Sequence, residues 1–313
     1  VRQSSPEGII LKQARDDFEP DFGFNLHDQN RYYNVEGSSL PATISFLAPA
    51  YNEAREVNAV RSKAMKVIVG MNRLLQQLVP GQVGKYDDSF EARAFGDNIQ
   101  KWGTSTILIE SGAYPGDPEK QYIRQLNFMI LLDALYGIAT ENYLKYTEEQ
   151  YIAIPENDSK LMDLLIRNVE TVAGDNSYRT DIGIKSSERF LDSLILMKGN
   201  IVDWGDLSVY HGYQEIDARG MVLKKGKIWT EIIPMEKLTE ERALDLLREG
   251  YLAVATDKAS QGKIHQLPIV VFTEGNEPDL NIALDESPLF YLTKDGEKKI
   301  AIVNGQVVKM DEG

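Results

Sequence analysis

Two segments of the chain end in residues that can do chemistry. Residues 22–26 alternate aromatic or apolar side chains with small or polar ones, as in a strand, and lead into His27 and Asp28. Residues 104–109 have the composition of a buried strand and lead into Glu110. A strand-end histidine can bind a metal through a neutral ring nitrogen, and a partly desolvated carboxylate has a raised pKa that suits it to take a proton from metal-bound water. Sites in open α/β sheets lie at the carboxyl ends of strands, so both positions are candidates.

These residues also have other interpretations. A single histidine at a strand end is more often a hydrogen-bonded structural residue, and a glutamate followed by serine and glycine is more often a solvated loop charge. A further hypothesis pairs the carboxylates of Asp28 and Glu110 in a metal-independent hydrolase. Spacing alone leaves these interpretations open.

The first half of the chain alternates strands with long helices. Ser5 and Pro6 provide an N-cap and a first helical residue, and apolar residues three and four apart predict a long helix over 53–78. The predicted elements are helices over 6–18, 53–78, 97–102 and 122–138 and strands over 22–27, 42–47 and 104–110. This order predicts an α/β sheet with helices packed on its faces.

The pattern changes after about residue 151. Helices are predicted over 158–172 and 238–249, and short strand-like segments over 190–197, 209–216, 220–229 and 267–272. Asp295-Gly296 and Asn304-Gly305 are dipeptides that hairpin turns prefer, so the last 25 or so residues predict a three-stranded meander. We therefore expect an α/β domain over 1–150 and a β-rich accessory domain over 151–313.

Composition excludes several classes of function. The 313 residues include no cysteine, which excludes disulfides, cysteine-ligated zinc, iron–sulfur clusters and thiol nucleophiles. The net charge of −14 argues against a nucleic-acid partner and against attachment to an anionic membrane surface. No apolar run is long enough to span a membrane. The absence of cysteine does not fix the compartment; a periplasmic or secreted location is favoured over a cytoplasmic one.

The segments around His27 and Glu110 resemble parts of the zinc carboxypeptidase family of metallopeptidases, the carboxypeptidase A-like enzymes. DFGFNLHDQ (21–29) resembles the segment with that family's third zinc ligand, and TILIESG (106–112) the segment with its catalytic glutamate. The resemblance covers about residues 1–140 and implies part of a three-layer α/β/α catalytic domain. It also implies a zinc ion with His27 as a ligand and Glu110 as general base and acid.

The resemblance also suggests residues that bind substrate. A loop tyrosine covers the substrate in this family, which makes Tyr86 the candidate here. Arg93 and Asn98 are equally placed to bind a substrate carboxylate or a peptide carbonyl, although polar loop residues are more often simply solvated. The implied reaction is hydrolysis of a peptide or amide bond at a C-terminus.

The chain departs from the family pattern in its metal ligands. The family's other two ligands come from an upstream His-x-x-Glu motif, but no histidine precedes His27, and neither His211 nor His265 begins such a motif. We therefore expect the C-terminal portion of a longer enzyme, inactive alone, with zinc bound only in the full-length parent. Uncovered sheet edges would favour a homo-oligomer. The alternative is a non-catalytic binding or scaffold protein on the same fold.

Overall fold

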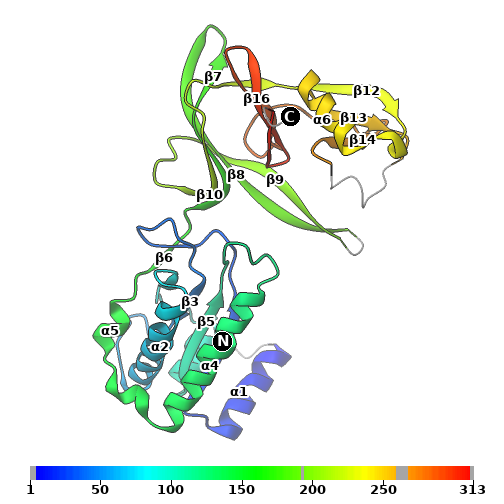
Figure 1. Cartoon of the computed structure of the whole chain (residues 1–313). Helices are drawn as coiled ribbons and strands as arrows, with labels where there is room; N and C mark the ends of the chain where they lie inside the picture. The colour runs from blue at the N-terminus through cyan, green and yellow to red at the C-terminus, as the bar shows by residue number, and fades with distance from the viewer. Residues whose placement is uncertain (1–4, 192–193, 259–266, 311–313) are drawn as a thin grey trace. The chain divides into compact units, whose positions relative to one another are not determined.

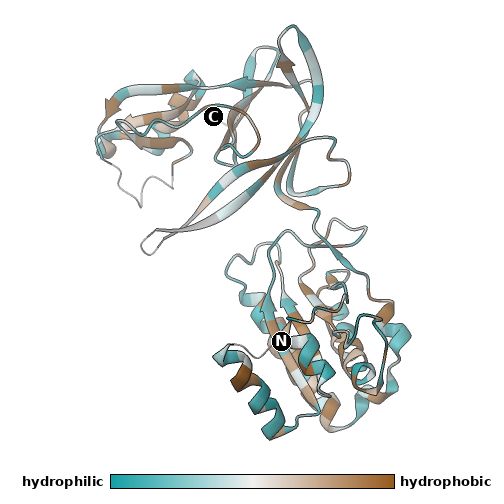
Figure 2. Cartoon of the chain, turned by 180° about the vertical axis from the view of Figure 1, so that it is seen from behind, coloured by the Kyte–Doolittle hydropathy of each residue, from teal (hydrophilic) through white to brown (hydrophobic). Residues whose placement is uncertain are grey.

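The computed structural model describes residues 5–191, 194–258 and 267–310, and the chain divides into two compact units (Figure 1). Unit 1 ends at Leu161, and unit 2 begins at Met162. Each unit has a hydrophobic core of its own, and Figure 2 shows apolar residues along the strands of both. No helix in the described residues is long and apolar enough to cross a membrane.

Unit 1 is built around a four-stranded sheet in the order β1-β5-β3-β4. Strand β5 is parallel to β1 and antiparallel to β3, while β4 is parallel to β3. The elements of unit 1 are α1 (Pro6–Phe18), β1 (Phe22–Asp28), β2 (Asn34–Val35), β3 (Ile44–Leu47), α2 (Ala59–Leu78), β4 (Val83–Lys85), α3 (Phe95–Lys101), β5 (Ser105–Ser111), α4 (Gln121–Ala139), the 3-10 helix η1 (Asn142–Lys145), α5 (Glu148–Ile152) and β6 (Asn157–Asp158).

Helices cover the two faces of this sheet unequally. The long helices α2 and α4 pack against one face, where Phe46 and Ile107 join the core (Figure 1). The short helix α3 packs on the other face, where Gly96 approaches Asn25 and Thr106. Because side chains alternate between the faces of a strand, His27 lies on the same face of the sheet as Asn25, two residues before it.

The beginning of α2 differs from the sequence prediction. The predicted helix starts at Glu53, whereas α2 starts at Ala59. The Asn58 side chain accepts a hydrogen bond from the backbone N–H of Arg61 and caps the helix. The preceding segment instead forms a loop in which Asn52 binds the Glu56 carboxylate.

Unit 2 is rich in β structure. Its eight-stranded sheet has the order β17-β16-β15-β11-β7-β8-β9, with β10 paired to β7, and a second sheet has the order β12-β13-β14. The elements are β7 (Leu161–Ala173), β8 (Asn176–Leu191), β9 (Leu194–Gly205), β10 (His211–Asp217), β11 (Val222–Lys225), β12 (Lys227–Ile233), the 3-10 helix η2 (Met235–Lys237), α6 (Glu240–Glu249), β13 (Tyr251–Thr256), β14 (Val270–Thr273), β15 (Leu289–Lys294), β16 (Glu297–Val303) and β17 (Gln306–Lys309).

The helix predicted over 158–172 is wrong, because this segment forms strand β7. Leu164 and Ile166 of β7 belong to one core cluster, while Leu165 packs with Leu207 in another. A strand buried on both faces has an almost continuous apolar run, and such a run can imitate helical spacing.

The prediction of a mixed α/β chain is confirmed, and so is the C-terminal meander. Strands β15, β16 and β17 pair antiparallel, and both turn dipeptides have positive φ angles: 53° and 84° at Asp295 and Gly296, and 53° and 87° at Asn304 and Gly305. The carboxypeptidase-like layering implied by the family resemblance is not confirmed.

Candidate functional site

His27 and Glu110 lie side by side at the carboxyl ends of the parallel strands β1 and β5. They are partners in the strand register, and His27 Nδ1 is 3.8 Å from Glu110 Oε1. The other ring nitrogen, Nε2, is 3.0 Å from the Asn25 side-chain oxygen. The His27 side chain is 52% exposed and that of Glu110 only 13%, so the histidine contacts solvent while the glutamate is largely buried.

The sheltered position of Glu110 changes its acidity. Desolvation by burial raises the pKa of Glu110, the charge of His27 lowers it and that of Asp28 raises it, and the net shift is upward from the ordinary value. A carboxyl group with a raised pKa is a better proton acceptor when ionised than an exposed one. The geometry therefore provides an acid–base group with a histidine ring nitrogen 3.8 Å away.

A buried glutamine that follows β1 links the pair to β3. Ser45 of β3 is the register partner of Glu110 on its other side. Gln29, buried just after β1, donates from Nε2 to the Ala42 carbonyl at 2.7 Å and to Ser45 Oγ at 3.3 Å. Its Oε1 accepts a hydrogen bond from the Tyr86 hydroxyl at 2.7 Å. The hydrogen bonds of the Gln29 amide group thus join Ala42, Ser45 and Tyr86, and these residues form one wall of the site.

Tyr86 enters this wall as an extension of β4 rather than as a free loop residue. Its N–H donates to the Phe46 carbonyl at 2.9 Å, and its ring centre is 5.5 Å from that of Tyr33. Burial raises the pKa of Tyr86, and Tyr33 and the charge of Glu110 raise it further. The phenol therefore keeps its proton and stays a hydrogen-bond donor. Its role in covering a substrate remains a prediction.

Glycine is required at position 112, directly after β5. A Cβ atom at this position would lie 2.1 Å from the Ala42 carbonyl oxygen and 2.6 Å from Gln29 Nε2. The Gly112 N–H donates to the Thr43 carbonyl at 2.9 Å, which holds the backbone at this close distance. Only glycine leaves room for the Gln29 amide between β1 and β3.

Asp28 does not join Glu110 as a second carboxylate. It is the next residue after His27, so its side chain points to the opposite face of the sheet. There it forms an ion pair with Lys120, whose ammonium group also donates to the Ser111 carbonyl at 3.3 Å. The paired-carboxylate interpretation is therefore wrong for this structure.

Arg93 and Asn98 lie in the segment that leads into α3 and in α3 itself. The Arg93 side chain is exposed and forms a two-point contact with Glu91, at 3.0 Å from Nε and 2.9 Å from Nη2. The Asn98 amide donates to the Ala92 and Ala94 carbonyls at 3.0 and 2.6 Å. These contacts assign both residues to the local loop structure, and their role toward a substrate remains a prediction.

The described residues do not fit a zinc site. They contain no group of three or more histidine, aspartate or glutamate side chains that could hold a metal ion. His27 is the only histidine in the sequence of unit 1, and its ring nitrogens face Asn25 and Glu110. His211 lies in β10 of unit 2, and His265 lies outside the described residues. No step of the chemistry below is therefore assigned to a metal.

The sequence predicts roles for Glu110 and His27, which remain predictions, but it does not point to the residues behind them. In the sequence, Gln29 is only the second polar residue after the predicted strand 22–27, and Ser45 is one of two hydroxyl residues in the predicted strand 42–47. Their importance depends on the mixed order of the sheet, which brings β3 next to β5. No local pattern in the sequence specifies that order.

Comparison with known proteins gives no family for the chain. No protein-family model and no curated protein matches it. Among solved structures, an N-acyl-D-glutamate deacylase from Bordetella bronchiseptica is similar at 19% identity over 31% of this chain and 19% of its own, with a TM-score of 0.22. A D-hydantoinase from Thermus sp. is similar at 22% identity over 30% of this chain and 20% of its own, with a TM-score of 0.20. A D-aminoacylase is similar at 17% identity over 30% of this chain and 18% of its own, with a TM-score of 0.19.

These neighbours are amidohydrolases and not zinc carboxypeptidases. On this comparison the assignment to the zinc carboxypeptidase family is wrong, and so is the metallocarboxypeptidase function inferred from it. Of these neighbours, the deacylase was solved with zinc, and D-aminoacylase has a binuclear metal centre. The chain spans about a fifth of the length of these proteins, and likeness at such TM-scores carries no argument about its own activity.

Proposed function

We propose that unit 1 carries the acid–base site of a hydrolase that cleaves an acyl bond, an amide or an ester, with Glu110 as the proton-transfer group. The observation that carries this proposal is the contact between Glu110 and His27, 3.8 Å apart at the carboxyl ends of parallel strands. Such strand ends are where α/β sheets place their sites. The raised pKa of Glu110 supports the same role.

The chemistry follows from the protonation of Glu110. When ionised, its carboxylate takes a proton from water while the water oxygen attacks the acyl carbon. The protonated carboxyl group then returns that proton to the leaving nitrogen or oxygen as the acyl bond breaks, which restores the carboxylate. No oxidant or reductant is needed, and the net reaction consumes one water molecule.

The neighbouring residues position this group rather than react. Asn25 holds the His27 ring, which faces Glu110 through Nδ1 and favours the ionised carboxylate by its charge when protonated. Gln29 and Tyr86 fix the wall beside Ser45. The exposed side of His27 leaves the pair open to solvent, from which both water and substrate must come.

The test is a hydrolysis assay on the purified chain with a panel of N-acyl amino acids and carboxylic esters. Glu110→Gln keeps the shape of the side chain but removes the proton acceptor, and should lower the rate by about 10²- to 10⁴-fold. Glu119→Gln changes an equally charged but exposed loop carboxylate and should leave the rate unchanged. Each assay is run with added zinc and with a chelator, so that any metal requirement is measured separately.

The outcome of this assay is decisive for the role of Glu110. If Glu110→Gln hydrolyses the same substrates as fast as the unmodified chain, the proposal is wrong. If the unmodified chain turns over nothing in the panel under either metal condition, the cluster is a structural or binding feature instead.

A further inference from the structure

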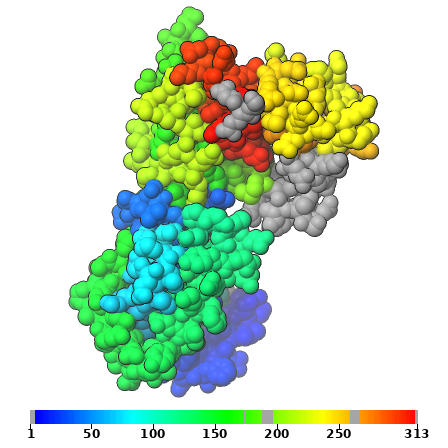
Figure 3. Space-filling view, viewed as in Figure 1, coloured from blue at the N-terminus to red at the C-terminus, as the bar shows by residue number. Residues whose placement is uncertain are grey.

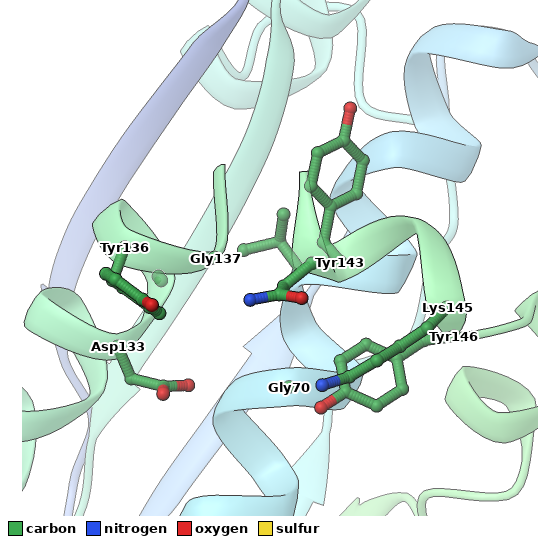
Figure 4. Close-up of a pocket in the computed structure, with 10 residues that line it drawn as sticks. Gly70, Asp133, Tyr136, Gly137, Tyr143, Lys145 and Tyr146 are labelled. Carbon is green, nitrogen blue, oxygen red and sulfur yellow. The ribbon is translucent and has the colours of Figure 1, made fainter. Parts of the chain in front are cut away.

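A second feature of unit 1 is a cavity of about 150 Å³ between α2, α4 and η1 (Figure 4). Tyr143 of η1 lines it and packs edge to face against Phe22, with ring centres 5.5 Å apart. Phe22 is the first residue of β1, so the cavity lies toward the amino end of the strand whose carboxyl end carries His27. The cavity is therefore separate from the acid–base site.

Opposite charges face each other across this cavity. Figure 4 shows the Asp133 carboxylate of α4 and the ammonium group of Lys145 of η1 on opposite sides of the opening. Both residues are exposed. In the described part of the chain, the Asp133 side chain forms no ion pair or hydrogen bond, and Lys145 contacts the Tyr146 ring with Nζ 5.2 Å from its centre. Neither charge therefore neutralises the other, although both line the same space.

Two glycines inside helices border the same space. Glycine in a helix interior costs about 1 kcal/mol relative to alanine, so a glycine there usually has a packing or functional reason. Gly70 of α2 has a packing reason, because a Cβ atom there would lie 3.2 Å from the Tyr146 ring. Gly137 of α4 has none, because nothing lies within 4 Å of a Cβ atom built on it. Because Gly137 has no side chain, the cavity stays open at this position.

We propose that this cavity binds a small zwitterion with the chemistry of a free α-amino acid. Its ammonium group would lie at Asp133 and its carboxylate at Lys145, so that each charge of the protein gains an opposite charge beside it. Asn142 also lines the cavity, and its Nδ2 donates to Thr140 Oγ1 at 2.9 Å, which orients its amide oxygen as a further acceptor for the ammonium group.

The size of the cavity limits the ligand. A water molecule takes up about 30 Å³ in the liquid, so 150 Å³ corresponds to roughly five waters, which suits an amino acid as small as alanine or serine. A simple cation would satisfy only Asp133 and a simple anion only Lys145. The pairing of both charges around one small space is what favours a zwitterion over either.

The test is a titration of the full chain with L-alanine and L-serine, followed by isothermal calorimetry and by NMR chemical shifts. We expect a dissociation constant of about 1 mM or tighter for at least one of them. Methylammonium and acetate each carry only one of the two charges and should bind at least tenfold more weakly. Glu110→Gln should bind the amino acid normally, because this proposal does not depend on the acid–base site.

Variants of the cavity provide the controls. Asp133→Asn and Lys145→Gln should each weaken binding at least tenfold, whereas Glu119→Gln, which removes an exposed carboxylate elsewhere on unit 1, should not. Gly137→Leu fills the opening with a residue that favours helices, so it should abolish binding without loss of fold.

Three results would overturn the proposal. They are no measurable binding at about 50 mM amino acid, equal binding of acetate or methylammonium, and full binding by the folded Gly137→Leu variant.

Discussion

His27 and Glu110 are register partners in the parallel strands β1 and β5, with Nδ1 and Oε1 3.8 Å apart. The pair depends on strand register, because a slip of one residue would turn His27 to the other face of the sheet, where Asp28 now meets Lys120. The pairing of β1 with β5 thus keeps His27 next to Glu110.

The pH dependence of hydrolysis should report the environment of Glu110. The base must be ionised to act, and burial raises its pKa above 4.5, the ordinary value for glutamate. The rate should therefore fall on the acid side with a midpoint above pH 4.5. A profile of kcat/KM against pH measures this midpoint, and a midpoint at or below the ordinary value would contradict the buried position of the base.

Glu110→Gln should separate activity from stability. A group whose pKa is raised by folding stabilises the fold while protonated and loses that contribution as pH rises through its folded pKa. At pH 7 the ionised Glu110 therefore destabilises the folded state, and the glutamine variant should unfold at the same temperature or higher. Below about pH 4.5 the two proteins should melt alike, as scanning calorimetry can show.

Tyr86→Phe tests the wall behind the pair. The Tyr86 hydroxyl donates to Gln29 Oε1 at 2.7 Å, and removing it leaves a buried amide oxygen without that donor. A buried acceptor without a partner costs about 1–3 kcal/mol, so urea denaturation should show a loss of this size. The rate should fall less than in Glu110→Gln, because Tyr86 positions the site and transfers no proton. An unchanged stability would mean that water replaces the phenol.

Gly112→Ala should damage both the fold and the site. The new Cβ atom would lie 2.1 Å from the Ala42 carbonyl and 2.6 Å from Gln29 Nε2, so either the backbone or the glutamine must move. We expect a loss of about 1–3 kcal/mol, typical of overpacked interiors, together with a lower rate. Gly116→Ala provides a contrast at a second glycine, since no atom lies within 4 Å of its added Cβ, although its φ of 81° strains any side chain.

Much of unit 1 was predictable because its signals are local. The Ser5 cap and Pro6 mark the start of α1, and the alternation of β1 ends at the histidine that the structure places beside Glu110. The apolar spacing of α2 and the apolar composition of α4 predicted both helices, and each buries a stripe of residues in the core of unit 1.

The rest depends on contacts between residues distant in the chain. Gln29 can bind Ser45 only because β3 packs beside β5. Asp28 was predicted to pair with Glu110, but it forms an ion pair with Lys120, which lies far from it in the sequence. The strand β7 imitated a helix because it is buried on both faces, a property set by residues distant in the chain, such as Leu207, that join its two core clusters.

Arg61 and Asp88 give a final prediction about the stability of unit 1. The Arg61 side chain is 1% exposed and donates from Nη2 to Asp88 at 2.6 Å, from Nε to the Ala48 carbonyl at 3.0 Å and from Nη1 to the Arg55 carbonyl at 2.8 Å. Burial would raise the pKa of Asp88, but the hydrogen bonds and charges of Arg61 and Arg55 outweigh it and lower the pKa below its ordinary value. The fold therefore favours the ionised carboxylate.

Asp88→Ala leaves the Arg61 charge buried without its carboxylate. Breaking a fully buried pair costs 3–5 kcal/mol, and we expect about 2 kcal/mol here because the Asp88 side chain is 34% exposed and screened by water. Asp17→Asn, an exposed carboxylate on α1, should cost almost nothing. A lowered pKa contributes stability that is present above the ordinary value of 3.8 and lost as pH falls through the folded pKa, so the difference from the unmodified chain should shrink below about pH 4. A difference that stays constant from pH 7 to pH 3 in urea denaturation would assign the loss to packing and not to the ion pair.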